Sequence, residues 1–196
     1  MCHRFLADAR LYPLLFKIDR DLAQKTKAAR CVYCGAVLHV ANYDRKPRGV
    51  DDQFKAEVST RFSYCCAECR RRTTPPSVRF LGRKVYLGVV VVLITAMQQG
   101  LSPQGEKVIL KNLAVDRKTV EAWKKWWTEA FQQTDYWKEA RRQIVFALPA
   151  VLKLPFSLLT HFDTEICLEN LCRCLRFLSP ITTLFKISRR AKLWPC

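Results

Sequence analysis

The sequence CVYCG at residues 31–35, followed later in the chain by YCCAEC at residues 64–69, decides how this chain folds. Each stretch holds two cysteines separated by two residues. This spacing directs both thiolates at one ion, because the intervening backbone makes a tight turn. Gly35 suits such a turn, since glycine adopts a positive φ without strain. Two pairs complete a tetrahedral shell, so we expect one zinc ion, Zn2+, held by Cys31, Cys34, Cys66 and Cys69.

The residues around the second pair leave the third ligand open. Either Cys65 or Cys66 could act with Cys69, and the two-residue spacing favours Cys66. His39 is the only nearby histidine, and we expect it on a half-buried strand face because four thiolates already fill the shell. Glu68 is expected to point to solvent. Neither H-x-E nor H-E-x-x-H occurs in the sequence, so the zinc is expected to be structural rather than catalytic.

The basic segment RRRTTPPSVRFLGRK at residues 70–84 follows the second pair and holds six cations and no carboxylate. Its two prolines force an extended backbone, and guanidinium groups fixed beside a metal site suit bidentate contacts to phosphate. The alternative is a solvated run of charge. Between the cysteine pairs we expect two strands, at residues 36–43 and 61–64, with a connection at 46–49. Here we predict phosphate contacts by Arg70, Arg71, Arg72, Arg79, Arg83 and Lys84.

The composition favours a polyanionic partner in a reducing compartment. The formal net charge is +17 and the sequence pI is about 9.7, which few proteins carry without nucleic acid to neutralise it; a basic ribosome-like or merely soluble protein is the alternative. Charges interrupt residues 1–20, so we expect no signal peptide, a cytoplasmic location and reduced cysteines. The longest apolar run, residues 85–97, is shorter than the ~20 residues that cross a bilayer, so no membrane partner is expected.

Residues 82–131 have the pattern of a helix-turn-helix unit. A first helix is expected at 85–99 despite its valine run, a second at 106–113, a turn at 113–116, and a third helix from Arg117 with Asp116 as its N-cap. Val108, Ile109 and Leu113 are predicted to face inward from the second helix, and Val115, Val120 and Trp123 from the turn and third helix. The polar face of the third helix suits the major groove; an ordinary helical hairpin is the alternative. Its predicted DNA contacts are Arg117, Lys118, Thr119, Lys124 and Lys125.

Together, the two cysteine motifs and the third helix (LAVDRKTVEAW at residues 113–123) resemble the zinc-ribbon plus helix-turn-helix region of insertion-sequence transposases and their InsA-like accessory proteins. The resemblance covers roughly residues 28–131. It implies recognition of terminal inverted repeats or of a promoter, with the same four cysteines as ligands and a reading helix that begins at Arg117. Such transposases continue into a nuclease domain with three metal-binding carboxylates, for which this chain has too little sequence after residue 131.

The flanking segments complete the predicted organisation. Residues 1–27 are expected to form two short helices separated at Pro13. The region 132–196 is expected to be helical with a basic tail, and the apolar stretch 156–177 either covers the helix-turn-helix core or binds a partner. Cys167, Cys172 and Cys174 are expected to be buried apolar residues rather than ligands. The fold class is therefore α+β and mostly α, with boundaries at residues 27, 81 and 131.

These observations predict a zinc-stabilised protein that binds double-stranded DNA and belongs to a mobile genetic element, as a transposition accessory or regulator. We expect it not to be an enzyme, and to act with a recombinase partner or as a homodimer. Two alternatives remain: an RNA-binding subunit of a ribonucleoprotein, and a nucleic-acid-processing enzyme with an unrecognised site.

Overall fold

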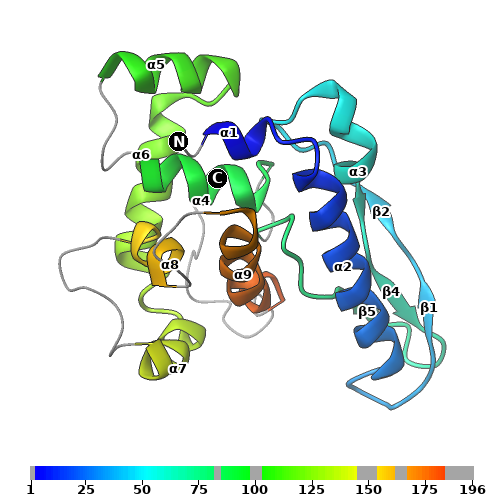
Figure 1. Cartoon of the computed structure of the whole chain (residues 1–196). Coiled ribbons are helices and arrows are strands. Elements are labelled where there is room, and N and C mark those ends of the chain that lie inside the picture. Colours follow the sequence, from blue (N-terminus) through cyan, green and yellow to red (C-terminus); the bar gives the residue numbers. More distant parts are fainter. Residues whose placement is uncertain (1–2, 82–84, 98–102, 145–153, 162–166, 184–196) are drawn as a thin grey trace.

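The computed structural model describes residues 3–81, 85–97, 103–144, 154–161 and 167–183. These residues form an α+β fold that is mostly helical, as predicted. Two small antiparallel sheets and the short helix α3 (Lys55–Ser59) lie along one side of the long helix α2 (Leu11–Ala28), and the helices that follow residue 87 gather on its other side (Figure 1). None of the described helices is both long and apolar enough to cross a membrane. Arg83, Lys84 and the predicted basic tail lie outside the described residues.

The helix α4, Gly88–Met97, is the centre of the helical part. Its residues 88–96 are all buried, as expected of a helix that is apolar on every face. The prediction of a helix rather than a strand at 85–99 is thus confirmed for residues 88–97, and residues 98–99 lie outside the described residues. Before the helix, Tyr86 and Leu87 form isolated bridges with Arg48 and Phe80. Gly88 permits this arrangement: a Cβ there would lie 3.1 Å from Leu81 Cγ, and its N–H donates to the Arg79 carbonyl at 2.7 Å.

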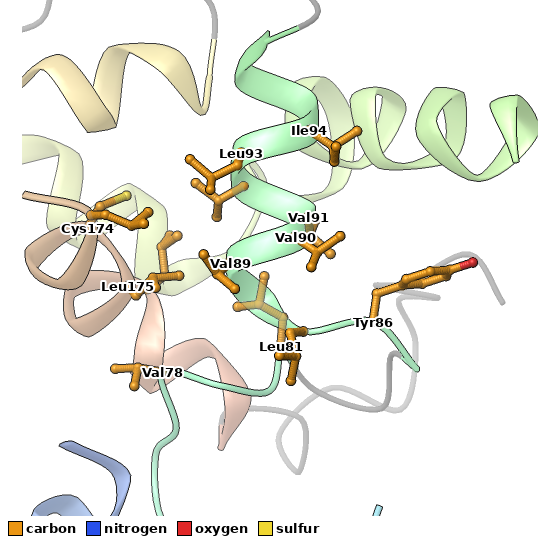
Figure 2. Packing of buried hydrophobic residues seen from close by; sticks show 14 of the residues in the cluster. Val78, Leu81, Tyr86, Val89, Val90, Val91, Leu93, Ile94, Cys174 and Leu175 are labelled. Carbon is orange, nitrogen blue, oxygen red and sulfur yellow. The ribbon is translucent and has the colours of Figure 1, made fainter. Parts of the chain in front are cut away.

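Four helices surround α4: α1 (His3–Leu6), α6 (Arg117–Lys125), α8 (Phe156–His161) and α9 (Leu168–Leu178). Val89 and Leu93 lie on the side of α4 that faces Cys174 and Leu175 of α9 (Figure 2). The described parts of the apolar stretch 156–177, residues 156–161 and 167–177, therefore cover the helical core, the first of the two predicted roles. Cys172 and Cys174 are buried there, as expected, whereas Cys167 is exposed.

The helix α2, Leu11–Ala28, corrects the prediction of a break at Pro13. Proline lacks an N–H, but the N–H groups in the first turn of a helix have no intrahelical partners. Pro13, the third residue of α2, therefore lies in the first turn without disrupting the helix. The break between the two N-terminal helices falls at residues 7–10 instead. Helix α2 packs its two ends differently: the Tyr12 ring stacks on Phe54, and the Ala23 carbonyl accepts a hydrogen bond from the Tyr64 hydroxyl.

The strands near the cysteine pairs, which we call the ribbon, form two small sheets. The first holds β1 (Leu38–Val40), β4 (Tyr64–Cys66) and β5 (Arg72–Thr73), with β4 in the middle; the second pairs β2 (Tyr43–Asp44) with β3 (Thr60–Arg61). The two predicted strands are thus confirmed in part, because each is interrupted. The interruption lies where the Asn42 side chain, rather than a backbone carbonyl, accepts the Ser63 N–H. A 3₁₀ turn at Asp52–Phe54 and helix α3 (Lys55–Ser59) fill the connection.

Arg79, which we predicted to contact phosphate, is instead completely buried beside Asp19. The Asp19 carboxylate accepts hydrogen bonds from the Ser77 hydroxyl at 2.5 Å, the Val78 N–H at 2.6 Å and Arg79 Nε at 2.8 Å. The other guanidinium nitrogens donate to backbone carbonyls of α3 and β3. The apolar residues beside Arg79 draw this part of the basic segment into the core, and the buried carboxylate of α2 compensates the charge.

The remaining helices continue from α6. A π-helical turn, Trp126–Ala130, follows α6 directly and buries both of its tryptophans, so they pack in the core. Helix α7 then spans Asp135–Ile144, and a 3₁₀ turn at Ser179–Thr182 follows α9. The apolar core joins residues of all four predicted segments, from Leu6 to Ile181.

Replacing Asp19 by alanine should strongly destabilise the chain. It leaves the Arg79 guanidinium buried without a counter-charge, which typically costs about 3–5 kcal/mol of unfolding free energy. Urea denaturation followed by circular dichroism measures the change. Glu139→Ala is the control, because it breaks an exposed ion pair with Arg142 and should cost less than ~1 kcal/mol. Equal effects of the two substitutions would contradict the role assigned to the buried pair.

Candidate metal centre and nucleic-acid interface

Four cysteine thiols converge at the end of the ribbon. The Sγ atoms of Cys31 and Cys69 are 3.6 Å apart, those of Cys34 and Cys66 are 3.4 Å apart, and all four lie within 4.8 Å of one another. A tetrahedral thiolate shell with metal–sulfur distances of ~2.3 Å has sulfur–sulfur edges of about 3.8 Å. A disulfide would need about 2.0 Å. The four thiols therefore have the spacing of a metal centre.

Two similar turns present these thiols. In the first, the Cys31 N–H donates to the Ala36 carbonyl at 3.0 Å; in the second, the Cys66 N–H donates to the Arg71 carbonyl at 3.0 Å. Each hydrogen bond spans five residues, and each turn has a residue with positive φ directly after its second cysteine. In the first turn this residue is Gly35, as the sequence predicted, with φ of 72°. In the second it is Arg70, with φ of 56°.

The surroundings of the thiols shift the pKa values of Cys31 and Cys69 in opposite directions. Backbone N–H groups, chiefly that of Tyr33, outweigh the effect of burial and lower the pKa of Cys31 to about 6. The Arg71 N–H acts in the same direction on Cys69, but burial and the neighbouring sulfurs outweigh it and raise the pKa of Cys69 to about 12. The neighbouring sulfurs contribute to both pKa shifts, because the thiols lie close to one another.

The structure assigns the third ligand position to Cys66. Successive residues of a strand point to opposite faces, so β4 directs Cys66 into the cluster and Cys65 away from it. The Cys65 thiol lies 3.5 Å from the Arg70 carbonyl instead. His39 is opposite Cys65 in the sheet and is exposed rather than half-buried, because β1 is an edge strand. Glu68 is exposed, as predicted.

Three helices, α4, α5 (Pro103–Asn112) and α6, occupy the region for which a helix-turn-helix unit was predicted, and α5 begins at residue 103 rather than 106. Val115, Val120 and Trp123 are buried, as predicted, and Leu113 is half-buried. The prediction for Val108 is wrong: its side chain is 59% exposed, and Leu110 is buried instead. Two residues along a helix correspond to ~200° of rotation, so the two side chains point to opposite faces. The side chain of Ile109 lies outside the described part of the chain.

The turn before α6 is held by specific contacts. Ala114 has a positive φ of 49°, and its carbonyl accepts a hydrogen bond from the Tyr86 hydroxyl at 3.1 Å. The Tyr86 ring meets Trp123 edge-on, with 5.1 Å between ring centroids. The Asp116 carboxylate caps α6 and accepts the hydroxyl and N–H of Thr119, each at 2.7 Å, which lowers the pKa of Asp116. The N–H and hydroxyl groups of Thr119 are therefore used in capping helix α6.

The predicted contact residues of α6 differ in their availability. Arg117 and Lys118 are exposed in its first turn. Lys124 forms an ion pair with Glu121 at 2.8 Å, and Lys125 lies 3.9 Å from Glu129. These surface pairs are weak and exchange readily for a phosphate partner. The first turn is thus the most strongly cationic part of this helix.

The predicted nucleic-acid contacts do not form one surface. Arg70, Arg71 and Arg72 are exposed at the ribbon, and α6 lies on the opposite side of the molecule, with α2 and α9 between them (Figure 1). Three further exposed cations, not predicted as nucleic-acid contacts, lie beside the first cysteine pair, where α2 ends. The sequence feature that indicates them is the density of cations immediately before Cys31. They are Lys25, Lys27 and Arg30.

Comparison with protein-family models, curated proteins and solved structures gives no match for this chain.

Serine at a ligand position should abolish stable metal binding. Cys31→Ser and Cys69→Ser each remove one of the four converging thiols, and a site with three thiolates binds zinc far more weakly. Zinc per chain, measured by atomic emission after dialysis, should fall from about one equivalent towards zero. Cys65→Ser is the matched control and should keep its metal. Full retention of zinc in both ligand variants would contradict the site.

Proposed function

We propose that this chain is a zinc-stabilised DNA-binding protein that reads double-stranded DNA with helix α6. The observation that supports this proposal is the first turn of α6, where Arg117 and Lys118 are exposed. The other face of the helix, with Val120 and Trp123, is buried in the core. A helix fixed on one side and cationic at its exposed N-terminal end suits the major groove, where basic side chains contact phosphates and base edges.

Zinc is the metal that the thiol cluster suits best. Four cysteines at tetrahedral spacing are typical of a structural Zn2+ site, whose shell has no open position for a substrate. In the proposed role the ion crosslinks the two turns and supplies no chemistry. It keeps the ribbon in place beside α2, where Cys31, Cys66 and Ala23 share one small apolar cluster.

The wider role that we propose is that of a transposition accessory or regulator of a mobile genetic element. The resemblance of residues 28–131 to the front end of insertion-sequence transposases supports it. We propose that the chain acts by binding rather than by catalysis, with a recombinase or a second copy as partner. The nuclease domain of such transposases uses three carboxylates, and this sequence has five carboxylates after residue 131. Asp135 and Glu139 lie on helix α7 and Glu169 lies on helix α9, while Asp163 and Glu165 lie outside the described residues.

Removing the cations of the first turn of α6 should weaken duplex binding. Arg117→Ala with Lys118→Ala leaves the Asp116 cap and the buried face intact, so the fold should persist. If both residues contact phosphates, the slope of log affinity against log salt should fall by roughly 1.8 in magnitude. Fluorescence anisotropy with labelled duplex DNA measures this change.

Lys138→Ala with Arg141→Ala is the matched control, because it removes two exposed cations from α7. Equal losses in the two double variants would contradict a role for α6.

Competition between duplex DNA and structured RNA at physiological salt separates the proposal from the RNA-binding alternative. Preferential binding of the RNA would favour the ribonucleoprotein role, and Mg²⁺-dependent nicking would favour the enzyme.

A further inference from the structure

The metal-binding end of the ribbon forms a second cationic surface that helix α6 does not share. Two segments build it, residues 25–37 and 67–72, and we call it the zinc-end surface. These segments hold six cations and one carboxylate, that of Glu68. All six cations are exposed. They are Lys25, Lys27, Arg30, Arg70, Arg71 and Arg72.

The two segments make one continuous surface. Arg30 precedes Cys31 and Arg70 follows Cys69, and the thiols of these two cysteines are 3.6 Å apart. The Arg71 guanidinium lies over the ring of Tyr33, 4.6 Å from its centroid, which again joins the second turn to the first. The cations of α2 and of the second turn are therefore neighbours, although about forty residues separate them in the sequence.

The zinc-end surface is also unusually apolar between its cations. Val32 is 75% exposed, and Tyr33 and Val37 are each 48% exposed. Beside them lies an open groove of about 420 Å³ along the last turn of α2. Its lining combines an amide, two cations and aliphatic side chains, namely Gln24, Lys27, Ala28, Arg30 and Val37.

Two of the cations occupy strained backbone positions. Arg30 has φ of 61° and Arg70 has φ of 56°, in the left-handed region that favours glycine. Gly35 fills the position in the first turn that Arg70 fills in the second. Both residues end a local turn: Arg30 directly follows Ala29, the C-cap of α2, and Arg70 directly follows the second cysteine of its turn. Glycine fits both backbone positions, so the two guanidinium groups can be removed without disturbing either turn.

We propose that the zinc-end surface binds single-stranded DNA, with its cations on the phosphates and its apolar residues against the bases. Charge complementarity selects a polyanion. The exposed valines and Tyr33 select a single strand, because a duplex stacks its bases inside and presents mainly phosphate to such a surface. A single strand offers unstacked bases that fit an apolar floor with a cationic rim. This surface lies across the molecule from α6, so the proposal is independent of duplex reading (Figure 1).

The first test uses the zinc-loaded full chain and a labelled single-stranded oligothymidylate, with binding followed by fluorescence anisotropy. Arg30→Gly with Arg70→Gly removes two cations and relieves two strained positions, so zinc content and thermal stability should be kept or increased. Affinity should fall about tenfold, and the salt slope should decrease by roughly 1.4 for two lost phosphate contacts. Lys138→Ala with Arg141→Ala on α7 removes the same charge and should change affinity less than about twofold. Unchanged affinity of the glycine variant would overturn the proposal.

The second test separates base contact from charge. Tyr33→Ala should weaken single-strand binding about tenfold with little change in the salt slope, as the loss of a stacking contact does. Arg117→Ala with Lys118→Ala should leave single-strand binding unchanged, so a failure of the α6 proposal is distinguishable from a failure of the proposal for the zinc-end surface.

Duplex DNA that displaces the single strand with equal affinity would overturn the choice of a single strand. Tighter binding of the matching single-stranded RNA would overturn the assignment to DNA.

Discussion

The buried pair of Asp19 and Arg79 is the interaction on which the rest of the structure depends. One carboxylate on α2 accepts three hydrogen bonds from residues 77–79, and the guanidinium that it neutralises donates to carbonyls of α3 and β3. Helix α2, the ribbon and the segment that leads into α4 are thereby fixed to one another. A buried charged side chain is stable only when all of its hydrogen-bond partners are correctly positioned. This pair therefore restricts the arrangement of the three parts more strongly than apolar contacts would.

That arrangement determines how the metal centre and helix α6 are related. Helix α2 runs from the helical core to the first cysteine pair, and its Ala23 carbonyl receives the Tyr64 hydroxyl of the ribbon. The segment after Arg79 enters α4, against which α6 packs through Val120 and Trp123. The ribbon and α6 thus lie on opposite sides of α2 and α9 (Figure 1). The basic segment does not join them as a surface; its middle is buried as a structural link.

The molecule therefore presents two cationic surfaces with different chemistry. The first turn of α6 is polar, with Arg117 and Lys118 above a buried face, and suits a duplex groove. The zinc-end surface combines cations with exposed aliphatic and aromatic side chains, including Tyr33, and suits unstacked bases. A net charge of +17 is consistent with two such surfaces in one chain. If both proposals hold, the chain contacts duplex and single-stranded DNA at the same time.

The sequence by itself determined the local features: the four thiol ligands, the positive φ of Gly35, the Asp116 cap, and the buried face of α6. These follow from spacing and from interactions within a few residues. Only the tertiary structure decided that Arg79 is buried and which face of α5 is buried. Each of these depends on what packs against it from a distant segment. A cation in a basic run looks the same whether it meets solvent or a buried carboxylate 60 residues away, and only packing distinguishes the two.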